Sequence, residues 1–119
     1  MLEELRAGRK QSHWMWFIFP QMRGLGRSEI AAYYGIAGRV EAEAYLKDPV
    51  LGQRLEQCVE LLMQLQGRTA AQIFGELDAM KLRSSLTLFA SVAPAGSIFE
   101  EALGKYFGGE RDPLTLARL

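Results

Sequence analysis

One stretch of the sequence, residues 48–67, constrains the fold more than any other. Its apolar residues recur three and four positions apart, the spacing that places side chains on one face of an α-helix. They are Leu51, Leu55, Cys58, Val59 and Leu62. Asp48 followed by Pro49 is typical of a helix start, because a carboxylate satisfies free amide groups and proline suits the first helical position. The stretch therefore predicts a helix that buries this face and ends by Gly67.

Glycine and proline divide the rest of the chain into short segments that carry helix signals. Besides the end of a helix near residues 2–9, the sequence predicts short helices over 12–19, 28–34, 40–46, 69–74, 77–92 and 98–107, and one or two turns after Asp112-Pro113. The aromatic run at 14–19 fits a buried strand as well, but no second strand-like segment is present to pair with it. A chain of 119 residues is the size of one domain. We therefore expect a compact all-α domain, 1–119, of about seven short helices in an irregular bundle or a small horseshoe.

The segment 77–92 is expected at the centre of this domain, because its apolar residues lie on two sides of a helix. One side carries Leu77, Met80 and Leu88, and the other carries Leu82, Leu86 and Phe89. Such a helix is expected to pack against neighbours on more than one side.

Composition excludes several classes of function. Acidic and basic residues number 14 each, so the whole molecule has no long-range attraction for nucleic acid or membrane. The longest apolar stretch, Trp14 to Pro20, is about a third of the ~20 residues that a membrane-spanning helix needs. The charged N-terminus does not resemble a signal peptide, so the sequence predicts a cytoplasmic protein. His13 and Cys58 are the only histidine and cysteine, which excludes a disulfide within the chain, a multi-histidine metal site and the usual structural zinc sites. A site made of carboxylates stays open, but no ligand spacing indicates one, so we predict neither a metal nor a cofactor. We interpret Cys58 as a core residue.

One candidate ligand surface lies near the N-terminus. Residues 5–28 contain five basic and no acidic side chains, interleaved with aromatic rings. Guanidinium and ammonium groups bind phosphate, and rings stack on bases, so this mixture is typical of a site for a nucleotide or another flat anion. The alternative is that the rings are core and the charges form their solvated rim. His13 is either a general acid or base or a hydrogen-bonded structural residue. The candidate ligand-binding residues here are Lys10, Ser12, His13, Trp14 and Trp16.

A second group of polar residues interrupts the apolar surface of the segment 77–92. Lys81 and Ser85 lie one helical turn apart, and Ser84 is adjacent. A half-buried lysine beside hydroxyl groups can bind phosphate or act as a base, so Lys81 joins His13 as a candidate catalytic residue. Alternatively, Lys81 extends its ammonium to solvent while the small serines allow a tight helix crossing.

Three functions follow from these residues. The first is a binding module, or an enzyme of unassigned reaction, for a phosphorylated or nucleotide-like small molecule, which requires that the two polar groups converge in one pocket. The second is a protein-interaction adaptor without catalytic activity. The third is a single-stranded nucleic-acid binder, which the zero net charge disfavours.

Several motifs along the chain resemble one protein family. They are Gly8 to Gln21 with its His13-Trp14 pair, Gly24-Leu25-Gly26-Arg27-Ser28, Tyr34-Gly35-Ile36, Pro49-Val50-Leu51-Gly52, Lys81-Leu82-Arg83-Ser84-Ser85 and Phe107-Gly108-Gly109. Together they resemble the DUF1810 family, and the likeness covers nearly the whole chain. The resemblance implies a small helical protein, mostly bacterial, of unknown function.

The resemblance also carries two expectations about the family. Some members are labelled calpastatin, but calpastatin-type inhibitors are disordered and rich in proline and charge, whereas 49% of this chain is hydrophobic. Members similar to this sequence usually begin with a further N-terminal helix. If that helix is missing here, the apolar surface that it would cover must be filled by another chain or left exposed, so we expect either a homodimer or a chain that lacks part of its N-terminus.

Overall fold

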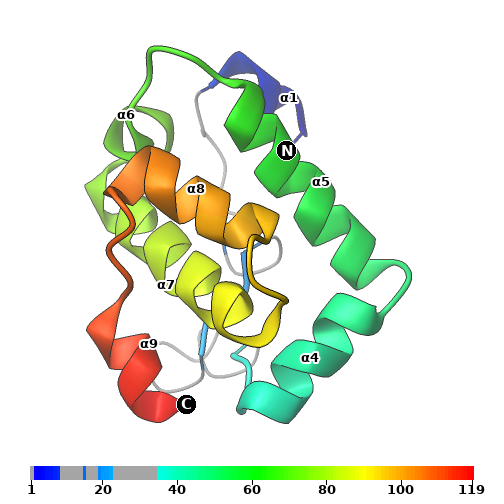
Figure 1. Cartoon of the computed structure of the whole chain (residues 1–119). Coiled ribbons are helices and arrows are strands. Elements are labelled where there is room, and N and C mark those ends of the chain that lie inside the picture. The colour runs from blue at the N-terminus through cyan, green and yellow to red at the C-terminus, as the bar shows by residue number, and fades with distance from the viewer. Residues whose placement is uncertain (1, 9–14, 16–18, 23–34) are drawn as a thin grey trace.

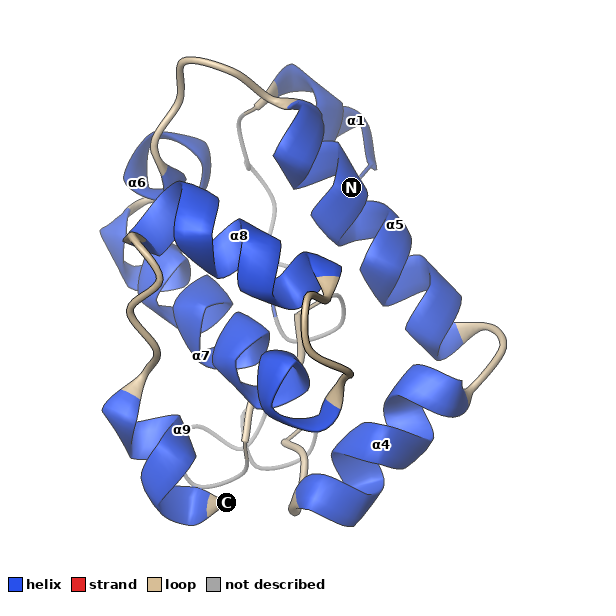
Figure 2. Ribbon diagram, in the orientation of Figure 1, coloured by secondary structure: helices blue, strands red, loops and turns tan. Residues whose placement is uncertain are grey.

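The computed structural model describes residues 2–8, 15, 19–22 and 35–119. This part of the chain forms seven helices, as Figure 1 shows: α1 (Leu2–Ala7), α4 (Arg39–Lys47), α5 (Leu51–Gln64), α6 (Ala70–Phe74), α7 (Glu76–Val92), α8 (Ile98–Phe107) and α9 (Pro113–Arg118). The β-type pairing within these residues is one isolated bridge between Met22 and Ile36, and Figure 2 shows helices joined by loops. The predicted all-α class is confirmed. Of the described helices, none is long and apolar enough to cross a membrane.

The helix α7 lies at the centre of the domain, as predicted. It is contacted by α4, α6, α8 and α9, which surround it in Figure 1. Its apolar side chains Leu82, Leu86, Leu88 and Phe89 are at most 1% exposed. The prediction was wrong for Leu77 and Met80, which are 70% and 66% exposed. Both lie in the first two turns of α7, whereas Leu88, on the same side of the helix but near its C-terminal end, is fully buried.

The core is centred on Phe89 of α7. Its ring lies 5.5 Å from the ring of Tyr45 on α4 and 5.7 Å from that of Phe99 on α8. The α5 residues Leu55, Cys58, Val59 and Leu62 are fully buried or nearly so. The face that the spacing predicted is therefore confirmed, except that Leu51 is partly exposed.

Local signals set most helix ends where the sequence places them. Thr69 and Gln72 form a reciprocal capping box at α6, and the Ser97 and Asp112 side chains cap α8 and α9. The helix α5 begins later than predicted, at Leu51, because 49–50 form a turn. The Asp48 carboxylate accepts hydrogen bonds from the amides of residues 50 and 51, at 2.9 Å each. These donors favour the charged carboxylate and hold the pKa of Asp48 below its usual range.

The C-terminal end of α5 is capped by two side chains of α8. The Lys105 ammonium donates hydrogen bonds to the carbonyls of Leu62, Met63 and Leu65, and the Tyr106 hydroxyl also donates to that of Leu62. Leu62 and Met63 lie in the last turn of α5 and Leu65 is its C-cap, so their carbonyls lack the amide donors four residues ahead that carbonyls within a helix have. A cation at this position also interacts favourably with the helix dipole. The contact therefore fixes α8 against α5.

The close approach of α4 and α5 depends on Gly52. A Cβ atom at this position would lie 2.1 Å from the backbone oxygen of Leu46, which no real Cβ contact allows. By contrast, a Cβ atom at Gly104, in the exposed part of α8, would have no neighbour within 4 Å. The two glycines therefore form a matched pair for testing the α4–α5 contact.

We predict that Gly52→Ala destabilises the protein by about 1–3 kcal/mol, because α4 and α5 must move apart. Gly104→Ala should stabilise it by roughly 0.5–1 kcal/mol, because alanine loses less conformational entropy in a helix. Urea denaturation measures both changes. If both substitutions changed the free energy of unfolding by the same amount in the same direction, the close approach of α4 and α5 at Gly52 would be contradicted.

The Cys58 thiol is fully buried on α5. Burial raises its pKa from 9.0 to about 11, because desolvation disfavours the thiolate. The thiolate is the nucleophilic form of cysteine, so this residue is chemically inert in the folded protein. The interpretation of Cys58 as a core residue is confirmed.

We predict that Cys58 in the native protein resists Ellman's reagent at pH 8 and reacts at once in concentrated urea. The raised pKa belongs to the folded state, so the folded protein holds its thiol proton at pH values where the unfolded chain releases it. The free energy of unfolding should therefore fall as the pH rises from about 9 to about 11. Cys58→Val should reduce that fall. Rapid labelling of the native protein would contradict the burial.

Candidate functional site

The predicted ligand-binding residues fall into two groups. Lys81, Ser84 and Ser85 lie on α7. The other five lie outside the described residues, and they are Lys10, Ser12, His13, Trp14 and Trp16. The structure therefore describes the geometry of the candidate site only for the three residues on α7.

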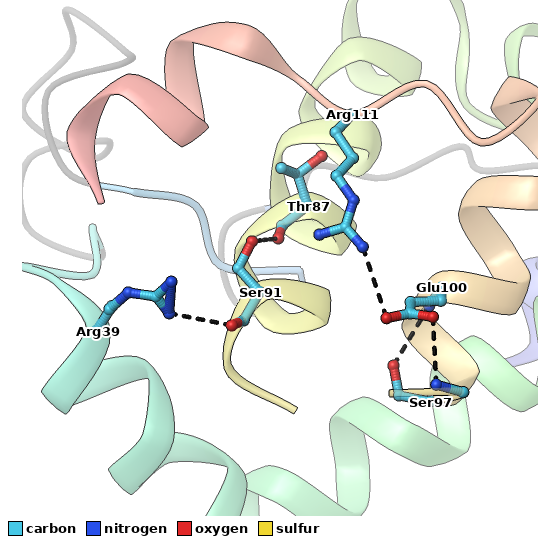
Figure 3. A network of polar contacts seen from close by, with 7 residues as sticks. Arg39, Thr87, Ser91, Ser97, Glu100 and Arg111 are labelled. Carbon is cyan, nitrogen blue, oxygen red and sulfur yellow. Dashed lines mark hydrogen bonds and ion pairs between the residues drawn. The ribbon is translucent and has the colours of Figure 1, made fainter. Parts of the chain in front are cut away.

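Three hydroxyl groups of α7 each donate a hydrogen bond to the backbone carbonyl four residues earlier in the same helix. Ser84 donates to Met80 at 3.2 Å, Thr87 donates to the carbonyl of residue 83 at 2.8 Å, and Ser91 donates to that of Thr87 at 2.7 Å, as Figure 3 shows. Such bonds to the i−4 carbonyl are the usual way for a hydroxyl to be satisfied within a helix. Ser85 differs: it is 1% exposed, and within the described part of the chain its Oγ has no hydrogen-bond partner.

Lys81 lies one turn before Ser85. Its ammonium nitrogen is 3.2 Å from a carboxylate oxygen of Asp78, and the two side chains are 22% and 19% exposed. The ammonium is thus partly withdrawn from water and held beside a carboxylate. Because residues four apart share a helix face, the Lys81 ammonium and the Ser85 hydroxyl are two hydrogen-bond donors on the same side of α7.

Ser84 joins α7 to α9. Its hydroxyl also lies 2.9 Å from an Asp112 oxygen, and that oxygen accepts hydrogen bonds from the backbone amide and the hydroxyl of Thr115, at 3.2 and 2.5 Å. The Asp112 amide in turn donates to the Thr87 hydroxyl at 2.9 Å. The single hydroxyl proton of Ser84 is therefore shared between its own helix and the cap of α9.

Two arginines connect other elements to this region. Arg39 of α4 donates to the Ser91 carbonyl at 3.0 Å, and Arg111 pairs with Glu100 of α8 at 3.5 Å. Figure 3 shows both contacts on either side of the α7 C-terminal turns. Arg83 of α7 donates to the Arg111 carbonyl at 2.9 Å. The Arg83 bond holds the loop before α9 on α7, and the Arg111–Glu100 pair holds the same loop on α8.

A groove of about 540 Å³ lies among α4, α5, the end of α7 and the start of α8. Its apolar lining includes Leu46, Val92, Ile98 and Phe99. Its charged lining consists of Glu43, Glu56, Glu60 and Lys47. Sequence analysis missed this groove, because its residues come from four segments that show no shared motif. Among the described residues, no three acidic, histidine or cysteine side chains lie close enough to hold a metal ion.

Comparisons with known proteins identify the family. The model of the family described as "Protein of unknown function (DUF1810)" matches residues 1–119. The crystal structure of the conserved hypothetical protein Rv1873 from Mycobacterium tuberculosis matches with a TM-score of 0.96 and 53% sequence identity, over 99% of this chain and 84% of that chain. No curated protein gave a significant match. The chain belongs to the DUF1810 family, whose function is unknown.

Proposed function

We propose that this protein binds a phosphorylated or nucleotide-like small molecule, as a binding module or as an enzyme that acts on such a ligand. The observation that carries the proposal is the buried Ser85 hydroxyl without a described partner, one turn from the Lys81 ammonium. The basic and aromatic residues that the sequence singled out would supply further phosphate contacts and a stacking ring. They are Lys10, Ser12, His13, Trp14 and Trp16.

The conformation of Ser85 supports a role beyond folding. A buried polar group without a partner costs roughly 1–3 kcal/mol, so native proteins rarely retain one. Ser84, Thr87 and Ser91 avoid that cost by donating to the preceding turn. Ser85 lies in the same helix but does not make this bond. Its proton is thus not committed to the preceding turn, and the proposal requires that a ligand on the Lys81 side of α7 reach a side chain that is 1% exposed.

The Asp78 carboxylate would lower the affinity of the Lys81 ammonium for an anion. It holds the Lys81 ammonium at 3.2 Å and offsets its charge. A phosphate group carries more negative charge than a carboxylate and forms stronger hydrogen bonds with cationic donors, so it competes with Asp78 for the ammonium. Removing the Asp78 charge should therefore strengthen the binding of an anion, whereas removing the Lys81 charge should abolish it.

The two remaining hypotheses predict different outcomes. A protein-interaction adaptor predicts no response to small phosphorylated molecules. A single-stranded nucleic-acid binder predicts a response to oligonucleotides that falls steeply with added salt. The zero formal charge of the whole chain weighs against this last function.

We predict that inorganic phosphate, pyrophosphate, a sugar phosphate or a mononucleotide raises the melting temperature of the protein. A ligand at a hundred times its dissociation constant adds about 2.7 kcal/mol to the free energy of unfolding. Lys81→Met should abolish the shift, and Ser85→Ala should weaken binding roughly tenfold, as expected for a hydrogen bond to a charged group. Asp78→Asn should tighten binding. Calorimetric titration with the compound that gives the largest shift measures each affinity.

Ser84→Ala is the matched control. Ser84 is one of the candidate ligand residues, but its hydroxyl already contacts the Met80 carbonyl and the Asp112 carboxylate, so its removal should lower the melting temperature without changing the affinity. Ser85→Ala should leave the unliganded protein at least as stable as the wild type, because it removes an unpaired buried group. No shift with any of these compounds, or a shift that survives both Lys81→Met and Ser85→Ala, would refute the proposal.

A further inference from the structure

We infer that the groove among α4, α5 and α8 is a docking site for a basic amphipathic helix of a partner protein. This inference is independent of the proposed function, because the groove contains neither Lys81 nor Ser85. It is carried by two properties of the groove: an apolar floor that is accessible from outside, and a rim of carboxylates that have no partner among the described residues.

The apolar floor comes from three helices. Leu46 of α4, Val92 of α7 and Ile98 of α8 line the groove and are only partly buried, while Phe99 beneath them is 2% exposed and belongs to the core. The volume, about 540 Å³, lies within the range of binding pockets in proteins. An apolar surface of this kind is stabilised when the apolar face of a partner covers it.

The rim of the groove is acidic. Glu56 and Glu60 lie one turn apart on α5, and Glu43 lies on α4. Within the described part of the chain, none of the three carboxylates forms an ion pair or a hydrogen bond. Like charges four residues apart weaken a helix, so a cation placed between Glu56 and Glu60 would relieve an existing repulsion. Among the described lining residues, three carboxylates surround the floor against one cation, Lys47.

This combination selects one kind of occupant. A basic amphipathic helix places apolar side chains at spacings of three, four and seven against the floor and its lysines or arginines against the rim. Acidic and anionic ligands are repelled by the three carboxylates. Among the seven described helices, α9 alone carries an excess of basic residues, and only by one, so no described helix of a second copy matches the acidic rim. The basic segment 5–28 of a second copy is the competing occupant, and the measurement of oligomeric state below separates the two.

The test uses the whole protein and three labelled synthetic peptides. The first is an 18-residue helix with leucines on one face and lysines elsewhere, the second replaces the lysines by glutamates, and the third replaces the leucines by serines. Fluorescence anisotropy at low salt should show binding of the first peptide, with affinity at least tenfold weaker for each of the other two. Amide chemical shifts should change at Leu46, Val92 and Ile98 when the first peptide is added.

The double variant Glu56→Gln/Glu60→Gln should weaken binding of the first peptide about tenfold and flatten its salt dependence. The matched control Glu76→Gln/Glu110→Gln makes the same change of net charge at two exposed residues outside the groove, and it should change the affinity less than twofold. An equal loss in both double variants, or equal binding of the acidic peptide, would overturn the inference. So would sedimentation equilibrium that shows a dimer dissociated by the Glu56/Glu60 variant alone, because the occupant would then be a second copy.

Discussion

The rest of the structure depends on the burial of α7, because a helix covered by four others must satisfy its polar side chains without bulk water. It does so partly through its own backbone and partly through Asp112, which accepts bonds from Ser84 and from the first turn of α9. The same aspartate donates its amide to Thr87. The polar residues of α7 therefore determine where the last helix attaches, and Ser85 stands apart because it takes no part in this arrangement.

The domain separates two surfaces of opposite character. The Lys81 side of α7 carries a partly exposed ammonium above a buried hydroxyl, whereas the groove at the other end of the helix carries carboxylates around apolar side chains. Lys81 and Val92 are eleven residues apart, which corresponds to about 16 Å along a helix. A chain with zero net charge thus carries two local regions of opposite charge, which are the two binding sites that we propose. The rigid helix between them fixes their separation.

The sequence was sufficient for features that depend on neighbouring residues. The buried face of α5 and the helix start at Asp112-Pro113 were predicted from neighbouring residues, and the structure confirms them. The Thr69 capping box and the Ser97 cap depend in the same way on residues three positions apart. Features set by contacts between distant segments could not be predicted. The exposure of Leu77 and Met80, the bond from Ser84 to Asp112 and the groove all depend on how helices far apart in the chain pack together. The periodicity of a sequence indicates which face of a helix is apolar, but it does not indicate which neighbouring helix covers that face.

Native-state hydrogen exchange of the α7 amides tests the central position of this helix most directly. Exchange by local opening requires only the free energy of that opening, whereas exchange of a central element requires unfolding of the whole domain. We expect that the amides of residues 82–90 exchange with the same free energy as global unfolding in urea, and that the ends of α4 and α9 exchange with less. Exchange of the α7 amides at a lower free energy than those of α5 would contradict the account, because α7 would then open while its neighbours remain folded.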